Sequence, residues 1–436
     1  MPNDAYDVIV VGGGSAGTIA AIQAGRAGAR TLLIEKNARL GGVTINSGIN
    51  YPGLFHAWGV QIIAGIGWEM VARAVREEGG ELPDFTLKPA RHFRHQIRVD
   101  MMIYPAILDQ ALMAAGVELL AHTMVGAAQE TASGWDLTIC CKEGLKSLSC
   151  KALIDCTGDS SVVSLAGYPV RRPEYTQPST LSCYATGYDL STLDTAALNA
   201  EFKAAIARGE VKASDGCWRT DQPNIGHWLG TKGQNGNHIQ GDPNSRTSAG
   251  RTVLEVEGRQ AIYRIYRFLR SQPGFDNLQI DWVSPEVGMR ETVTIEGDAC
   301  VTLEDFTSSK VWPDAVCYAF YPIDLHGMDS HQWHFEEVPK GTIGTIPRGA
   351  LLPVGSRNLL AAGRCFSSDR LANSAMRVQA PCMAMGQAAA AMAVLAADRG
   401  TTVRELPMAD IAALLGEHDA LVPGFHDLGP IGYRDE

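Results

Sequence analysis

The sequence predicts an α/β fold in which one discontinuous domain carries a second, mixed α+β domain as an insertion. Residues 6–35 read as a buried strand, a glycine-rich turn, a helix and a second strand. From about Tyr168 the composition becomes richer in polar, aromatic, glycine and proline residues. Near Asn358 the first pattern returns, as a buried strand followed by a long helix of small residues. We therefore expect a Rossmann-like domain at 1–167 and 344–436, and an inserted substrate domain at 168–343.

The remaining elements follow from apolar periodicity and from glycine or proline boundaries. Apolar residues spaced three and four positions apart predict helices, and alternating apolar and polar residues predict strands. The expected helices are 65–79, 104–115, 190–208, 252–270 and 381–398, and the expected strands are 117–121, 135–141, 148–154 and 358–362.

Length and composition limit the classes of protein. At 436 residues the chain is too long for one ordinary core. A net charge of −11 without a lysine or arginine run argues against nucleic acid or an anionic membrane as partner. No apolar run approaches the roughly 20 residues of a membrane span, and the first core strand leaves no room for a signal peptide. With 10 scattered cysteines and no CxxC motif, we expect a cytoplasmic protein with free thiols. The segment from Thr401 is a packing or contact element, which leaves a homo-oligomer open.

The first turn carries the pattern of a dinucleotide site. Gly12 permits a tight turn, Gly14 lets the backbone approach a pyrophosphate, and Gly17 lets the helix pack on the strand. The N-terminus of that helix presents free N–H groups to the phosphates. Glu35, at the end of the next strand, can accept hydrogen bonds from ribose hydroxyls and would repel a 2′-phosphate. The pattern predicts a dinucleotide that is not NADP.

Three further segments favour FAD over NAD. The glycine pair ending at Gly42 would let the backbone turn beneath the long flavin end of the cofactor. A strand runs into Gly158, where a loop returns to the pyrophosphate crevice. Gly363 follows the last strand, and Pro381 is expected at the first position of the next helix. The N-terminus of that helix would stabilise the negative charge of a reduced flavin.

Motifs along the whole chain carry a family resemblance. They are Val11–Gly17, Gly41-Gly42, Cys156–Asp159, Tyr321–His326, Ile346–Leu351, Ala362–Cys365 and Met376–Gln387. By these motifs the chain resembles the glutathione-reductase-like flavoproteins of two-dinucleotide-binding-domain ancestry, and within them a large bacterial group of FAD-dependent oxidoreductases. The resemblance implies FAD near Gly12, Gly14, Gly17, Glu35, Gly42, Gly158 and Gly363, with the backbone around Val125 facing the adenine. It leaves the substrate open. Where the group often has a second basic residue after an Arg-Glu-Thr run, this chain has Val293.

The loop between the last strand and the last long helix is rich in polar groups. Asp369, Asn373 and Arg377 are the candidates there for contact with flavin or substrate, with Arg377 the strongest. The alternative is a solvated surface loop. Cys365 and Cys382 flank this region, and buried inert thiols are favoured over a redox pair.

Two histidines are candidate general bases, His326 and His56. His326 could instead hold Asp324 in place. A metal site built with His331 and His334 is the less favoured interpretation, and no metal is expected.

Two further residues are candidates for substrate binding. Trp58 could stack on a substrate ring or could close the domain as part of an aromatic clamp. Arg290, together with Glu291, could bind a polar substrate, although an interdomain ion pair is the favoured interpretation.

The sequence therefore predicts an enzyme that transfers a hydride between FAD and a small polar organic substrate: a polyol, a sugar or a hydroxy-acid. An ene- or keto-reductase and a flavin-binding protein without redox turnover remain alternatives. The electron acceptor is unknown from the sequence.

Overall fold

The computed structural model describes residues 5–241, 243–327 and 333–434. Its main sheet has five parallel strands in the spatial order β5 (Glu118–Leu120), β2 (Thr31–Ile34), β1 (Ala5–Val11), β8 (Gly144–Asp155) and β17 (Leu359–Ala361). β7 (Gly134–Cys141) and β6 (Met124–Thr131) continue the sheet as an antiparallel meander from the first half of β8. In chain order the parallel strands run 3-2-1-4-5, which is the order of a Rossmann-like sheet.

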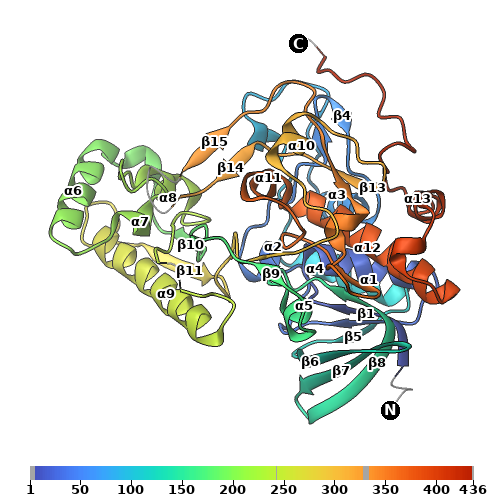
Figure 1. The fold of residues 1–436 in the computed structure, drawn as a ribbon. Helices are drawn as coiled ribbons and strands as arrows, with labels where there is room; N and C mark the ends of the chain where they lie inside the picture. Colours follow the sequence, from blue (N-terminus) through green and yellow to red (C-terminus); the bar gives the residue numbers. More distant parts are fainter. Residues whose placement is uncertain (1–4, 242, 328–332, 435–436) are drawn as a thin grey trace.

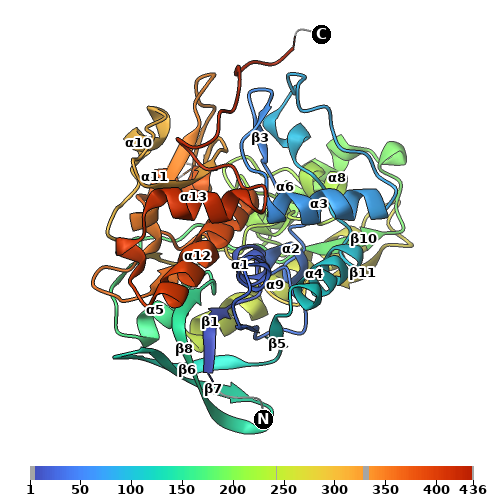
Figure 2. The ribbon, with the colours of Figure 1, turned by 90° about the vertical axis from the view of Figure 1, so that its right-hand side faces the viewer.

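Helices cover one face of this sheet (Figure 2). They are α1 (Ser15–Arg26), α3 (Ile66–Glu77), α4 (Ile103–Ala114), α12 (Gln379–Arg399) and α13 (Met408–Gly416). α1 and α12 approach closely, because a Cβ on Gly386 would lie only 2.1 Å from the carbonyl oxygen of Ala16. This contact therefore fixes α1 and α12 relative to each other, and both helices begin beside the carboxyl ends of the parallel strands.

Helix α12 differs from its predicted form in two ways. With 21 residues and a mean hydropathy of 1.5, it is long and apolar enough to cross a membrane, whereas the sequence analysis expected no such run. Most of it, 89% of its most apolar window, is buried inside the protein, as expected for a core helix. It also begins at Gln379, so Pro381 is its third residue and not its first. Proline is tolerated there because the first-turn N–H groups have no partner within the helix.

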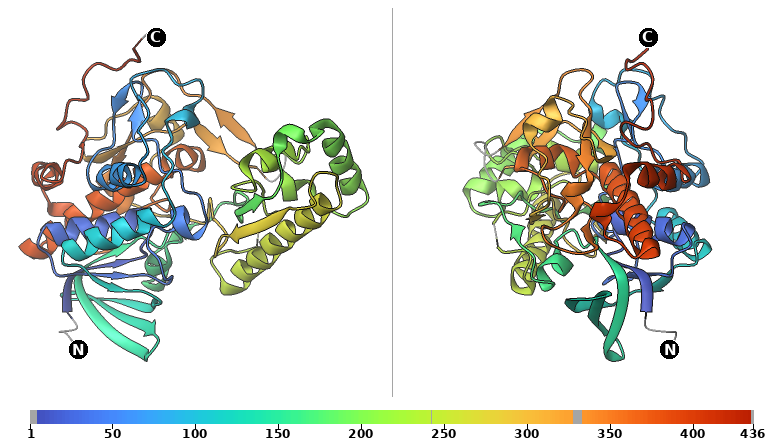
Figure 3. Two further views of the ribbon diagram at one scale, coloured as in Figure 1. Left: turned by 180° about the vertical axis from the view of Figure 1, so that it is seen from behind. Right: turned by 45° about the vertical axis from the view of Figure 1, so that its right-hand side comes forward.

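A separate lobe projects from this body (Figures 1 and 3). It contains α6 (Thr195–Ala207), α7 (Ala213–Gly216), α8 (Gly226–Thr231) and α9 (Ser248–Arg270), with the antiparallel pair β10 (Cys183–Thr186) and β11 (Gln279–Val283). Its own hydrophobic core runs from Leu181 to Met289. We call residues 181–289 the inserted lobe.

The rest of the predicted insertion packs with the main body. It contains α10 (Leu303–Thr307), β13 (Ala315–Ala319), β14 (Ile323–Leu325) and β15 (His334–Glu336), and β13 pairs with β16 (Gly344–Pro347). All five residues of β13 are buried, and Val316, Ile323 and Ile343 belong to the same core as α12. The segment with its own core is thus shorter than the predicted insertion, 168–343, because apolar β13 needs the helix layer for burial.

Candidate cofactor and substrate site

A single long cavity runs between the main sheet and the inserted lobe. Its volume is about 1460 Å³, larger than the about 300–1000 Å³ of typical small-molecule sites, so it can hold a long cofactor together with a second molecule. Val11, Ile34 and Ala362, at the carboxyl ends of three parallel strands, line one end. Ligands of open α/β sheets bind at this edge.

A backbone cradle forms the dinucleotide end. Gly12 has a φ of +98°, and a Cβ there would lie 2.5 Å from the carbonyl oxygen of Cys156. A Cβ on Gly42 would lie 2.7 Å from the Cα of Gly14. Gly17 does not line the cavity; a Cβ there would lie 1.8 Å from the carbonyl oxygen of Gly12, so it permits α1 to pack on β1. Side chains at these positions would fill the cradle or separate its walls.

Glu35 lines the cavity with a fixed carboxylate. Its Oε2 accepts a hydrogen bond from the backbone N–H of Gly13 at 2.6 Å, and its Oε1 accepts one from Asn37 N–H at 2.8 Å. Burial raises the pKa of Glu35 against the opposing effect of these two bonds. Val125 of β6 lines the same end of the cavity. The pair is suitably placed for a ribose and an adenine.

Farther along the cavity, Gly158 and Gly363 also line the wall. Beside them, the carboxylate of Asp159 accepts hydrogen bonds from Arg364 and from Arg251 of α9, the latter at 2.8 Å. An ion pair thus connects the inserted lobe to the cradle.

Three residues of the loop before the last long helix are predicted to contact flavin or substrate, and one of them lines the cavity. Arg377 lines the cavity, donates to Gln177 Oε1 at 3.0 Å, and has a buried Nε with no partner among the described residues. Asp369 lies outside the cavity because its carboxylate caps α11 (Arg370–Met376), accepting from Ala372 N–H at 2.8 Å.

Asn373 is the third of these loop candidates. It also lies outside the cavity, since its amide donates to Arg364 O at 3.0 Å and to Ser368 Oγ at 3.1 Å. Asp369 and Asn373 are therefore corrected from ligand contacts to structural residues.

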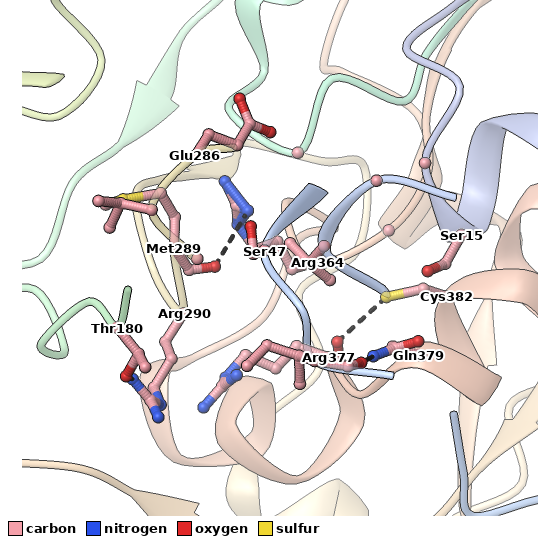
Figure 4. Close-up of a pocket in the computed structure, with 18 of the residues that line it drawn as sticks. Ser15, Ser47, Thr180, Glu286, Met289, Arg290, Arg364, Arg377, Gln379 and Cys382 are labelled. Atoms are coloured by element: carbon pink, nitrogen blue, oxygen red, sulfur yellow. Dashed lines mark hydrogen bonds between the residues drawn. The ribbon is translucent and has the colours of Figure 1, made fainter. Parts of the chain in front are cut away.

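Arg290 lines the cavity close to Arg377. Its guanidinium donates to Pro178 O and Thr180 Oγ1 at 2.8 Å each, and to Asn235 Oδ1 at 2.9 Å. Figure 4 shows the guanidinium groups of Arg290 and Arg377 pointing toward each other. Burial, and then the charge of Arg377, lower the pKa of Arg290 to about 10.

The favoured interpretation of Arg290 and Glu291, an interdomain ion pair, holds for Glu291 and not for Arg290. Glu291 pairs with Arg370 at 3.0 Å. This leaves the guanidinium of Arg290 facing the cavity with neutral hydrogen-bond acceptors only.

Asp324, His326 and His238 form a chain at the far end of the cavity. His326 Nε2 lies 3.1 Å from Asp324 Oδ2, and His326 Nδ1 lies 3.1 Å from Nε2 of His238, which comes from the inserted lobe. Burial lowers the pKa of His326 to about 4, and it lowers the pKa of His238 well below the ordinary value for histidine. Burial opposes ionisation of Asp324, but the hydrogen bond from His326 and the charges of Arg377 and Arg290 lower its pKa. Asp324 is thus a carboxylate beside two neutral imidazoles.

This arrangement changes the role predicted for His326. Both ring nitrogens are engaged, so neither is free to accept a substrate proton. Asp324 Oδ1 has no hydrogen-bond partner among the described residues, and its side chain lines the cavity with 21% exposed. His326 therefore holds one oxygen of Asp324 in place, which is the alternative considered for it. The sequence reasoning missed His238, because no local spacing connects residues 88 positions apart.

The structure places His56 and Trp58 outside the cavity. The imidazole of His56 stacks on Phe85 with ring centroids 3.8 Å apart, and burial lowers its pKa to about 4. Trp58 Nε1 donates to Thr342 O at 2.8 Å, and its ring packs edge-on against Phe320. The two side chains belong to one network of ring contacts, which runs through Phe85, His95 and Tyr433.

Two other side chains bear on metal and thiol chemistry. Among the described residues no cluster of three or more histidine, cysteine or acidic residues could hold a metal; His331 lies outside the described residues, and His334 faces Glu336 at 3.1 Å. Cys382 lines the cavity, where burial raises its pKa to about 12. It is therefore a neutral thiol.

The fold and the cavity are those of a dinucleotide-binding protein. A family model described as FAD dependent oxidoreductase matches residues 7–415, and the chain belongs to this family. It is an enzyme, and FAD is its cofactor. The glycine cradle and the fixed carboxylate of Glu35 are groups suited to hold this cofactor.

Curated relatives match only a short stretch. A segment of 53 residues is 49% identical to dihydrolipoyl dehydrogenase of Trypanosoma brucei brucei, covering 12% of this chain and 11% of the relative. A segment of 42 residues is 60% identical to nicotine dehydrogenase of Pseudomonas putida, covering 10% and 9%. The chain thus spans about a tenth of the length of these relatives.

Solved structures are similar over more of the chain, at low identity. A geranylgeranyl bacteriochlorophyll reductase-like protein of Thermoplasma acidophilum is 13% identical with a TM-score of 0.42, covering 95% of this chain and 84% of its own. AlpK is also 13% identical with a TM-score of 0.42, covering 88% and 60%.

Proposed function

We propose that the enzyme oxidises a C–OH group of a small polar organic molecule (a polyol, sugar or hydroxy-acid), and that Asp324 accepts the hydroxyl proton at Oδ1. Bound FAD supplies the hydride acceptor. The observation that carries the proposal is the state of the Asp324 carboxylate: the side chain lines the cavity, one oxygen is held by His326, and the other has no hydrogen-bond partner among the described residues.

The charges around Asp324 support the direction of the reaction. A carboxylate with a lowered pKa is ionised at neutral pH, so it is ready to accept a proton and poorly suited to donate one. An ene- or keto-reductase needs a proton donor at this position. The oxidation is therefore favoured over the reductase.

The cofactor end of the cavity has a separate role. The cradle of Gly12, Gly14 and Gly42 binds the pyrophosphate region, and Glu35 accepts hydrogen bonds from a ribose. We also propose that the main domain descends from the glutathione-reductase-like flavoproteins, which its strand order supports.

An anaerobic titration tests the proposal. The holoenzyme and its Asp324→Asn variant are mixed with polyols, sugars and hydroxy-acids, and the flavin absorbance is followed. We expect one donor to bleach the wild-type flavin, and Asp324→Asn to slow that bleaching about 10²- to 10⁴-fold, the usual contribution of a general base. Asp276→Asn, on an exposed loop of the inserted lobe, is the matched control. Bleaching of Asp324→Asn at the wild-type rate would refute the role of Asp324, and a flavin that no donor bleaches would favour a protein without redox turnover.

A further inference from the structure

We infer that the substrate carries a carboxylate, which Arg290 and Arg377 bind, so that the enzyme acts on a hydroxy-acid and not on a neutral polyol or sugar. The inference rests on the proposed oxidation and names its substrate class. It follows from an excess of positive charge on two half-buried arginines at the same end of the cavity as Asp324.

The two arginines lack acidic partners. Among the residues that the structure describes, neither guanidinium has a carboxylate within 4.0 Å, and all their hydrogen-bond acceptors are neutral. Glu291, which could have paired with either, is held by Arg370. Asp324 is the acidic group whose charge reaches both arginines. Two cations and one anion leave one positive charge to be neutralised.

Two other arginines of the cavity wall do have a carboxylate partner. Arg364 and Arg251 share the carboxylate of Asp159, beside Gly158 in the cofactor part of the cavity. His326 and His238 are neutral, because burial lowers the pKa of both. The Arg290–Arg377 pair differs from these two arginines, because among the described residues neither of its guanidinium groups has a carboxylate partner.

An unused donor points to the same ligand chemistry. Arg377 lines the cavity, and its Nε is a buried atom with no hydrogen-bond partner among the described residues, although the guanidinium already contacts Gln177 Oε1. A buried donor without an acceptor costs about 1–3 kcal/mol, and a buried charge without a partner costs more. A carboxylate supplies both the acceptors and the charge, and guanidinium groups bind it with matched geometry. A neutral polyol would leave the charge uncompensated.

A bound carboxylate would also improve Asp324 as a base. It neutralises the two arginines that lower the pKa of Asp324 and adds a negative charge nearby, and both effects raise that pKa toward neutrality. The reaction then balances. The substrate C–H bond breaks and its electron pair leaves as hydride to the flavin. The O–H bond breaks with its proton going to Asp324, and a C=O bond forms.

Binding of unreactive ligands tests the inference without turnover. The holoenzyme is titrated with propionate and with propionamide, and binding is followed by the flavin absorbance and by tryptophan fluorescence, since Trp218 and Trp333 line the cavity. We expect binding of propionate and at least 10-fold weaker binding of propionamide. Arg377→Met and Arg290→Met should each weaken propionate at least 10-fold. Arg208→Met, an exposed arginine of the inserted lobe, should bind as the wild type does.

Other results would overturn the inference. Equal affinity for propionate and propionamide would refute a carboxylate site. So would an Arg377→Met variant that keeps wild-type propionate affinity while its flavin reduction potential shifts, since the arginine would then serve the reduced flavin. If either methionine variant fails to fold, Arg377→Lys and Arg290→Lys replace it and should weaken propionate less. Because no electron transfer is involved, propionate binding can fail or succeed independently of the Asp324→Asn result.

Discussion

The two ends of the cavity are built by different means. The cofactor end is mostly backbone: glycines whose missing side chains make room, in one segment of about 30 residues and two short loops. The substrate end is made of side chains from four distant segments, including Arg290, Asp324 and Arg377, with His238 contributed by the inserted lobe. Local sequence can define the first kind of site. The second exists only after the lobe and the main body pack together.

The largest effects should come from the backbone cradle. Gly17→Ala would place a Cβ 1.8 Å from the carbonyl oxygen of Gly12, so we expect loss of both folding and FAD. Gly14→Ala meets nothing closer than 3.7 Å and should fold, but its methyl group would occupy the approach to the pyrophosphate and weaken FAD. Thermal melting and the ratio of flavin to protein absorbance check both, with Gly230→Ala, which meets nothing within 4 Å, as control. A Gly17→Ala protein that binds FAD normally would contradict the claim that backbone without side chains builds the cofactor end of the cavity.

The second-largest effect should come from removing the charge of Glu35. Glu35→Gln keeps the size of the side chain and removes the charge that accepts ribose hydrogen bonds. Hydrogen bonds to charged groups contribute about 1.5–3 kcal/mol, so FAD affinity should fall about 10- to 150-fold. Equilibrium titration of the apoprotein with FAD measures this change. An unchanged dissociation constant would mean that Glu35 only orders the turn at Gly13.

His238 should change the pH dependence and leave substrate affinity nearly unaltered. Because Asp324 is anionic, His326 donates from Nε2, which makes its Nδ1 an acceptor and requires a donor from His238. His238→Phe frees His326 to adopt the other tautomer, so the pKa of Asp324 should rise. The rate is present above that pKa and is lost as pH falls through it. The acid limb of kcat/KM should therefore move up by about 1 pH unit, the equivalent of 1.36 kcal/mol.

The conservative variant gives the matching test for His238. The amide of Gln in His238→Gln can still donate to His326 Nδ1, so the limb should lie closer to its wild-type position. A merely structural role would change KM or stability and leave the limb in place. If the acid limb of kcat/KM stays at its wild-type pH in His238→Phe, a change of the His326 tautomer is excluded.

The smallest effect should come from His56. His56→Phe keeps the ring stacked on Phe85 and removes no group from the cavity. Turnover should stay within about twofold of wild type, and stability should change by no more than about 1 kcal/mol. Steady-state rates and urea unfolding measure both. A large loss of turnover would return His56 to the reaction.

The same contrast explains what the sequence could predict. The strand–turn–helix pattern of residues 6–35 gave the Rossmann-like sheet and the cavity-lining residues Gly12, Gly14 and Glu35, because each follows from local backbone requirements. Asp369 could not be separated from its neighbour Arg377 by sequence, since a helix cap and a ligand contact use the same polar residue types. His326 was found, but its role was not. Its two ring partners are set by tertiary contacts with Asp324 and His238.

The most direct test of the central claim is the pH dependence of anaerobic flavin reduction by a 2-hydroxy-acid, in wild type and in Asp324→Asn. The account predicts that the wild-type rate falls with decreasing pH as Asp324 becomes protonated. It predicts that Asp324→Asn is about 10²- to 10⁴-fold slower and lacks that acid limb. The same acid limb at a similar rate in both proteins would contradict it, because the proton would then go to a group other than Asp324.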